Sequence, residues 1–372
     1  IPMEKRKLTQ TFFGALARES GGPALYNWLG QRSNGFQSVH TFDQWVVVQQ
    51  GGKWRLFDPR FGQIESKPYD TIRAEGPFVV GVLTDTLYVH FRDNRVRMFV
   101  HPAAVSFIPG MDTTSFLLLK GDKQNTVYDL AGHKLFSGEF DALTYGGDGV
   151  FIVTKKEKKG LVNAAGQTLL PAEYDAIGTS QNGLISLLKN KRFGSYNVRD
   201  KKLIKPQYDR NLYPYGADWI TTFRDGYYGF LGWDNKAVSK FEFDEISYWN
   251  DSIALVRKGT FWNLYDIAHA NATSGNMRNV KLIKDTQAEK LAIVQKDNNF
   301  GVISSRRGVV VPISFSDVIN LGSAEEPLYF TEKQVREASL FVVIYYDRDG
   351  NLLRKEIYED PAEYDRIYCS DH

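Results

Sequence analysis

Short runs of apolar or alternating residues recur along the chain and are separated by Gly, Asn, Asp and Lys. One stretch holds three such runs, at 150–154, 160–163 and 168–174. Short runs of this kind between turn-forming residues predict β-strands. Each group of three runs is therefore predicted to fold as a three-stranded antiparallel meander, which makes the chain all-β.

The third run of each group ends in an aromatic residue followed by Asp, a pair that we call the aromatic-Asp mark. From Asp141 the marks repeat at steps of 34, 34 and 35 residues. Gaps of 71 residues after Asp70 and 73 residues after Asp244 each imply one eroded copy. A fixed interval in this range predicts one supersecondary unit tiled along the chain. The marks are Tyr69-Asp70, Phe140-Asp141, Tyr174-Asp175, Tyr208-Asp209 and Phe243-Asp244, with looser copies at Phe315/Asp317 and Tyr364-Asp365.

Two further positions keep the same register. Nine residues before the Asp there is a turn-forming residue, such as Gly132 or Gly166. Fifteen residues before the Asp, Gly160, Gly194 and Gly229 occupy equivalent places. We expect the aromatic of the mark to be buried in a core layer and the Asp to accept N–H bonds in the turn that leaves its strand.

An aromatic-Gly pair, a turn Gly, a Pro and a final Tyr-Asp together resemble the WG (KWG) β-repeat family of bacterial proteins. The resemblance is clear over residues 36–320, although no copy keeps an intact Trp-Gly pair. It implies a bacterial protein, often of the cell envelope, with no established chemistry. The best matches are Lys53-Trp54-Arg55 with Pro68 to Asp70, Lys159-Gly160-Leu161 with Pro171 to Asp175, Phe193-Gly194, Tyr228-Gly229 and Phe300-Gly301.

The pattern divides the chain into a cap segment, 1–33, and a repeat array, 34–372, of about nine or ten units of 34–36 residues. A short helix is expected over 8–18 in the cap, since terminal repeats need a polar covering element. The polar stretch 266–281 is expected to be an insertion loop. Meanders of this kind form either a propeller-like ring or an open superhelical array, and the sequence favours neither.

Charge and composition exclude several classes of protein. There are 46 basic and 44 acidic residues, a net charge of +2, which gives no reason to expect a nucleic-acid partner. No apolar stretch is long enough to predict a membrane span. The single cysteine, Cys369, excludes an internal disulfide. The run 155–159 is expected to be a solvated turn.

The motifs of common enzymes and cofactor sites are missing. The six histidines are scattered, so neither a zinc site nor any other metal site is expected. Residues 347–351 faintly resemble a calcium loop, but Asp349-Gly350 favours a hairpin turn. There is no nucleophile elbow and no phosphate loop. We therefore expect no cofactor and no enzymatic activity.

Aromatic side chains concentrate in the middle of the array. Tyr and Trp combine an apolar face with a polar tip, which suits a sugar ring or a protein surface, although core packing explains such residues too. The candidate ligand-binding residues are Tyr213, Tyr215, Trp219, Tyr248 and Trp249, and all of them except Trp219 are expected in loops after the marks.

The sequence thus favours a non-enzymatic scaffold that binds a protein or a glycan at the bacterial cell envelope. The expected location is extracytoplasmic, in the periplasm or on the outer-membrane surface. The alternatives are a propeller-type carbohydrate-active enzyme and a purely structural envelope component.

Overall fold

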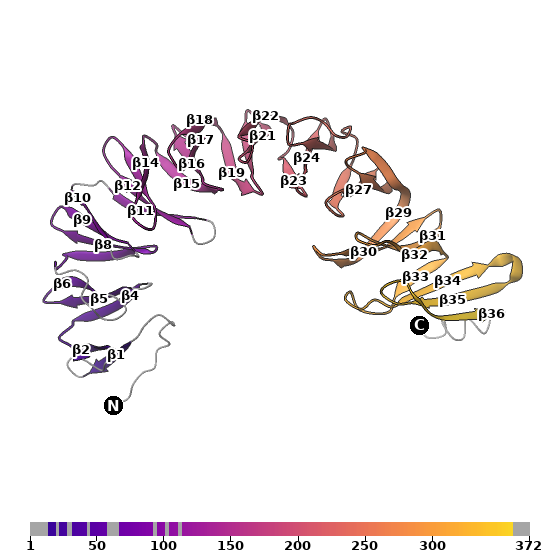
Figure 1. The fold of residues 1–372 in the computed structure, drawn as a ribbon, viewed down its shortest axis with the longest axis horizontal. Helices are drawn as coiled ribbons and strands as arrows, with labels where there is room; N and C mark the ends of the chain where they lie inside the picture. Colours follow the sequence, from indigo (N-terminus) through magenta and orange to yellow (C-terminus); the bar gives the residue numbers. More distant parts are fainter. Residues whose placement is uncertain are drawn as a thin grey trace. The chain divides into compact units, whose positions relative to one another are not determined.

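The computed structural model describes residues 14–19, 22–27, 32–42, 45–57, 67–91, 95–100, 104–110 and 114–359. They divide between two compact units, residues 1–190 and 191–372 (Figure 1). The copy expected at Tyr364-Asp365, and Cys369, lie outside the described residues.

Strands β1 to β20 belong to the first unit. They are β1 (Gly14–Glu19), β2 (Gly22–Asn27), β3 (Arg32–Ser33), β4 (Ser38–Phe42), β5 (Trp45–Gln50), β6 (Lys53–Phe57), β7 (Thr71–Glu75), β8 (Phe78–Leu83), β9 (Thr86–His90), β10 (Val96–Val100), β11 (Ala104–Pro109), β12 (Ser115–Lys120), β13 (Asn125–Tyr128), β14 (Lys134–Gly138), β15 (Ala142–Gly147), β16 (Val150–Lys155), β17 (Lys158–Asn163), β18 (Thr168–Tyr174), β19 (Ala176–Gln181) and β20 (Leu184–Lys189).

The second unit contains the remaining elements. They are β21 (Arg192–Asn197), β22 (Lys202–Tyr208), β23 (Tyr213–Tyr215), β24 (Trp219–Arg224), β25 (Tyr227–Gly232), β26 (Glu245–Tyr248), β27 (Ile253–Lys258), β28 (Phe261–Asp266), β29 (Asn271–Asp285), β30 (Lys290–Lys296), β31 (Asn299–Ser304), β32 (Gly308–Phe315), β33 (Asp317–Asn320), β34 (Tyr329–Val335), the 3-10 helix η1 (Arg336–Ala338), β35 (Leu340–Tyr346) and β36 (Leu352–Tyr358).

Consecutive strands pair antiparallel in small sheets whose strands follow chain order, such as β11-β12-β13-β14 and β33-β34-β35-β36. The predicted all-β fold of tandem antiparallel meanders is confirmed. Most sheets have one strand more than the predicted three, because the residues after each mark form a strand, as in β15 and β19. Whether the array closes into a ring stays a prediction.

The helix expected over 8–18 is wrong in its described part, because Gly14–Glu19 is strand β1 and pairs with β2. Strands β1, β2 and β3 thus form a small meander, and the predicted division at residue 33 stays a prediction. Throughout the described residues, no helix is long and apolar enough to cross a membrane.

Strands in the middle of a sheet are apolar on both faces because each face meets a different core cluster. On β12, Leu117 packs with Phe78 and Phe91, whereas Leu118 packs with Phe136 and Phe151. Successive side chains of a strand point to opposite faces, so neighbouring residues join opposite clusters. Because these strands are buried between two sheets, their residues are continuously apolar instead of alternating between apolar and polar.

The aromatic residues of the marks are buried, as predicted. Tyr69 is fully buried and Tyr174 and Tyr208 are each 2% exposed. Each is held by the third strand of its sheet: Tyr69 forms a bridge with Trp54, and Tyr174 pairs with Lys159.

The Asp of each of the five clear marks accepts a backbone N–H from a hairpin of the following sheet. Asp141 Oδ2 accepts from the N–H of Lys156 at 2.7 Å, and Asp175 Oδ2 accepts from that of Asn190 at 2.8 Å. The prediction placed this bond in the turn that leaves the Asp's own strand, and that placement is wrong. The bond connects one sheet to the next instead. Equivalent bonds are formed by Asp70, Asp209 and Asp244.

In three of the marks, the other carboxylate oxygen binds a cation at the start of the third strand in its own sheet. Asp175 Oδ1 accepts from Lys158 Nζ at 2.5 Å. The same pair is formed by Lys53 with Asp70 and by Arg192 with Asp209. One aspartate therefore connects two strands of its own sheet and the hairpin of its neighbour.

The recurrent glycine of the third strand lets the fourth strand approach closely. A Cβ on Gly194 would lie 2.5 Å from Ile204 O and 2.6 Å from Pro206 N. The pairing register shifts at Gly194, as it does at Gly160 and Gly301. A side chain at these positions would collide with backbone, so glycine is required there.

In β28 this position holds Asn263, and the glycine has moved to the partner strand. A Cβ on Gly275 of β29 would lie 2.5 Å from Asn263 Oδ1. The same oxygen accepts from the N–H of Asn276 at 3.0 Å. In this repeat, the glycine that lets the two strands approach closely therefore lies on β29 instead of β28.

Ser316, not Asp317, takes the place of the Asp after Phe315. Its N–H donates to Glu332 O at 2.7 Å, and its Oγ accepts from the N–H of Gln334 at 3.1 Å. A hydroxyl oxygen can accept this bond. The prediction that Asp317 serves as the aspartate of this repeat is therefore wrong, because Ser316 occupies that position. Asp317 itself begins β33.

The eroded copy between Asp244 and Phe315 lies in β29. Met277 pairs with Trp262 and is fully buried, as the aromatic of a mark would be. Arg278 follows it, and the strand continues to Asp285. The insertion loop predicted over 266–281 is therefore wrong, and a 15-residue strand joins two meanders into one seven-stranded sheet.

Candidate functional site

The five candidate aromatic residues lie in or next to strands of two consecutive sheets of the second unit. Tyr213 and Tyr215 are in β23, Trp219 begins β24, and Tyr248 ends β26 with Trp249 next to it. The prediction that Tyr213, Tyr215 and Tyr248 lie in loops outside the meander is wrong, because the residues after a mark form the first strand of the next sheet. Trp249 lies in the connection between β26 and β27, within the meander.

Tyr215 and Trp249 are buried side chains that stabilise the fold. They are 5% and 3% exposed. The hydroxyl of Tyr215 donates to Ile253 O at 2.8 Å and accepts from the N–H of Trp249 at 3.1 Å. Burial raises the pKa of Tyr215, which keeps the phenol protonated as this donor. These contacts fasten β23 to the following sheet.

Tyr248 lies at the surface beside Tyr215. It is 40% exposed, and the two ring centroids are 5.1 Å apart. Its hydroxyl donates to Asp251 Oδ1 at 2.7 Å. That hydrogen bond, helped by burial, raises the pKa of Tyr248 to about 12. The ring is thereby fixed, with part of its surface facing solvent.

Tyr213 is the second exposed aromatic of the group, at 50% exposure. Tyr213 and Tyr248 each lie four residues after the Asp of the preceding mark, so they occupy equivalent positions in consecutive sheets. Trp219 is partly buried and packs against the cluster that contains Tyr215. The exposed candidate surface therefore consists of Tyr213 and Tyr248.

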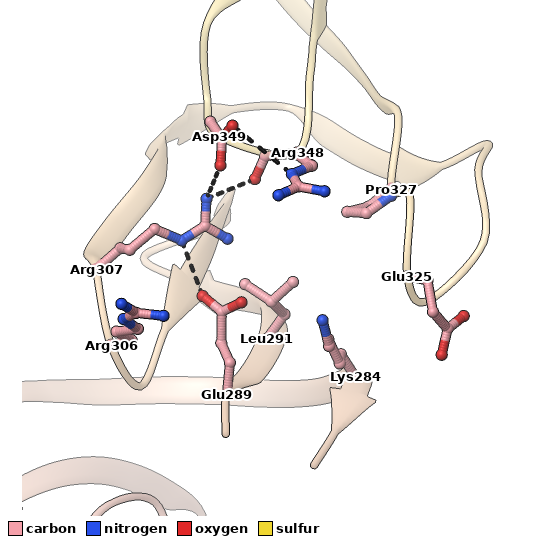
Figure 2. Close-up of a pocket in the computed structure, with 9 residues that line it drawn as sticks. All are labelled: Lys284, Glu289, Leu291, Arg306, Arg307, Glu325, Pro327, Arg348 and Asp349. Carbon is pink, nitrogen blue, oxygen red and sulfur yellow. Dashed lines mark hydrogen bonds and ion pairs between the residues drawn. The ribbon is translucent and has the colours of Figure 1, made fainter. Parts of the chain in front are cut away.

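A second site, missed from the sequence, is a pocket of about 170 Å³ in the second unit (Figure 2). Its walls come from β29, β30 and the connections β29–β30, β31–β32, β33–β34 and β35–β36. These segments are spread over residues 284–349 and share no motif, so no sequence pattern could have indicated the pocket. The lining residues are Lys284, Glu289, Leu291, Arg306, Arg307, Glu325, Pro327, Arg348 and Asp349.

Arg307 holds the pocket walls together. Its Nε donates to Glu289 Oε1, and one terminal nitrogen donates to Arg348 O and Asp349 Oδ1, each at 2.8 Å. Glu289 also accepts from Ser304 Oγ at 2.6 Å. Burial alone would raise the pKa of Glu289, but the bonds from Ser304 and Arg307 outweigh it and lower the pKa. This network fixes three of the connections around one guanidinium.

The sequence stretch that resembled a calcium loop is a hairpin turn, as predicted. Asp347 Oδ1 accepts from the N–H groups of Asp349 and Asn351, both at 2.8 Å. Gly350 has a φ of 82°, which the turn requires. In the described ranges, no three His, Cys, Asp or Glu side chains gather as a metal site would need. The turn predicted over 155–159 is shorter, because only residues 156–157 form it, while Lys155 ends β16 and Lys158 and Lys159 begin β17.

The fold and the recurrent Asp and Gly positions define a tandem antiparallel β-meander repeat protein. The family description "WG containing repeat" matches residues 160–193 and 228–260. These two segments are WG repeats, which confirms the resemblance found in the sequence. No curated protein matches the chain.

Among solved structures, the chain is similar to Kluyveromyces lactis Hsv2, at 10% identity and a TM-score of 0.27, over 67% of this chain and 97% of that one. It is similar to the extracellular domain of a putative one component system from B. thetaiotaomicron, at 10% identity and a TM-score of 0.26, over 95% and 81%. It is also similar to PorZ of Porphyromonas gingivalis, at 8% identity and a TM-score of 0.23, over 93% and 59%. At these scores no function follows from the likeness.

Proposed function

We propose that the chain is a non-enzymatic repeat scaffold of the bacterial cell envelope that binds a glycan through Tyr213 and Tyr248. The observation that carries the proposal is the pair of exposed aromatic rings at equivalent positions of consecutive sheets. Rings repeated in this way suit a ligand that itself has repeating units.

The chemistry beside Tyr248 fits a sugar. The C–H face of a sugar ring packs on an aromatic face, and its hydroxyl groups need polar partners nearby. Asp251 supplies a carboxylate next to Tyr248, and Asn211 supplies a side-chain amide within 3.5 Å of the Tyr213 hydroxyl. A protein partner is the alternative, since exposed tyrosines are also common in protein interfaces.

The test is binding of the purified chain to a panel of immobilised neutral and acidic oligosaccharides. We expect the double variant Tyr213→Ala/Tyr248→Ala to lose at least about tenfold in affinity, because stacking aromatics dominate such contacts. Tyr227→Ala removes an aromatic that is 45% exposed on β25 of the same sheet as Tyr213, and it should bind like the parent. Equal binding by the double variant and the parent would exclude this surface.

Two further measurements separate the alternatives. Release of reducing ends from a bound oligosaccharide would favour the propeller-type carbohydrate-active enzyme over a scaffold. Capture of an envelope protein that depends on Tyr213 and Tyr248, without glycan binding, would favour a protein partner. No ligand of either kind would favour a purely structural envelope component.

The proposed location is the periplasm or the outer-membrane surface, and it rests on the resemblance to WG repeats. The net charge of +2 gives no support to a nucleic-acid partner. Cell fractionation followed by detection of the chain tests the location, and recovery in the cytoplasmic fraction would contradict it.

A further inference from the structure

The pocket of Figure 2 contains more positive than negative side chains. Four cationic and three acidic residues line it, which leaves one positive charge. Arg307 and Glu289 neutralise each other at 2.8 Å and also hold the walls, so neither is available to a ligand. The excess charge therefore belongs to the other cations.

Among the residues that the structure describes, neither Lys284 nor Arg306 forms a side-chain hydrogen bond or ion pair, although the charge of Lys284 helps to lower the pKa of Glu289. Arg348 is only partly engaged: one terminal nitrogen lies 2.9 Å from Glu326 Oε1, and its Nε lies 3.7 Å from Asp349 Oδ2. Glu326 is 73% exposed and outside the lining, so solvent screens its charge. Arg348 thus keeps N–H donors for a further acceptor.

The positions of these groups suit a single anion. Figure 2 shows Lys284 and Arg348 on opposite sides of the open space, with Leu291 near Lys284 and Pro327 near Arg348. Leu291 and Pro327 are buried and apolar. A ligand that fits would place an anionic group between the two cations and a carbon skeleton against the apolar wall.

We propose that this pocket binds a carboxylate group, held between Lys284 and Arg348, with Arg306 adding positive charge at the rim. A carboxylate carries one charge and matches the single excess positive charge of the lining, whereas a phosphate near neutral pH carries more. A uronic acid is a ligand of this class. The site does not depend on the proposed glycan surface, because none of the five aromatic candidates lines the pocket.

Saturation-transfer NMR on the full chain tests the proposal, with D-glucuronate and acetate as probes and D-glucose as the uncharged control. We expect saturable binding of glucuronate and acetate, none of glucose, and weaker binding as salt is added. No binding of glucuronate, or equal binding of glucose, would overturn the proposal. Tighter binding of inorganic phosphate than of acetate would overturn the choice of a carboxylate.

Substitutions of the lining residues then test whether glucuronate binds in this pocket. Lys284→Met keeps most of the aliphatic stem and should weaken glucuronate binding at least about tenfold, since it removes a charge-assisted hydrogen bond. Lys281→Met is the matched control, because Lys281 is an exposed lysine on the same strand and outside the pocket lining. Arg348→Lys retains the charge and should bind weakly, whereas Arg348→Ala should not bind. Unchanged affinity in Lys284→Met, with an unchanged melting temperature, would assign the ligand elsewhere.

Discussion

At the scale of single residues, the aspartate of each mark acts as a connector between sheets. In Asp175, one carboxylate oxygen binds Lys158 of its own sheet and the other binds the N–H of Asn190 in the next hairpin. Both bonds favour the charged carboxylate. The hydrogen bond from the lysine, followed by that from the backbone, lowers the pKa of Asp175, and the same causes lower that of Asp70.

These lowered pKa values predict that acid destabilises the chain. The unperturbed aspartate value is 3.8, so the folded chain gains stability from the ionised form above that pH and loses it as the pH falls through the lower folded value. Asp175→Asn should be less stable than the parent at pH 7, and the difference should shrink below about pH 4. Urea unfolding at pH 7, 5 and 3.5 measures this.

Asp85→Asn is the control for the loss of one negative charge, since Asp85 is an exposed residue of the β8–β9 turn. It should unfold like the parent at pH 7. A difference between Asp175→Asn and the parent that stays constant from pH 7 to pH 3.5 would contradict the assignment of the effect to the carboxylate.

The glycine of the third strand gives a second prediction at this scale. Gly194→Ala should lower the free energy of unfolding by about 1–3 kcal/mol, because the new Cβ would meet backbone atoms that cannot move independently. Gly138→Ala is the matched control: its Cβ would meet only the Phe140 ring, at an ordinary 3.5 Å. Chemical denaturation of both variants measures this difference. Equal stabilities would show that the close approach of the third and fourth strands is not needed.

At the scale of elements, the sequence predicted the meander and its period because the turn residues and marks recur in most copies. The first strands were missed, since segments such as 176–181 have little apolar character of their own and pair only because a neighbouring strand is present. The long strand β29 was missed for a related reason. Its polar residues 271–276 resemble a loop, but they pair with β28.

The candidate sites, like the strands, could be predicted from the sequence only in part. Exposure could not be read from residue type, so Tyr215 and Trp249 were grouped with Tyr213 and Tyr248, although the first pair is buried. The pocket was beyond prediction because tertiary packing brings its separate turns together.

Met277 anchors strand β29 in the protein core. It fills the place of the mark's aromatic, fully buried in the cluster that contains Trp249 and Val294. Met277→Ala should lower the free energy of unfolding by about 2–5 kcal/mol, through lost burial and the cavity left behind. Arg278→Ala, at the exposed neighbouring position, should change it by no more than about 0.5 kcal/mol. Similar values for both in denaturant unfolding would mean that β29 is a peripheral strand.

At the scale of the whole molecule, each described core cluster that spans sheets joins only two consecutive ones. On β30, Leu291 and Ile293 pack toward β33 and β34, whereas Ala292 and Val294 pack toward β27 and β29 of their own seven-stranded sheet. The marks connect neighbouring sheets in the same way. Stability should therefore be a sum of contributions from sheets and from the contacts between neighbours, as in other repeat proteins.

Native-state hydrogen exchange on Met277→Ala tests this nearest-neighbour view. The lost packing lies between the two meanders that β29 joins in the seven-stranded sheet, so amide protection should fall most in β28, β30 and β31. Amides of β12 and β13 share no described cluster with Met277 and should keep the protection of the parent. Arg278→Ala should leave all of these strands unchanged. A uniform loss of protection over both units would instead show that the chain unfolds as one cooperative body, because a local cavity would then lower the stability of every sheet equally.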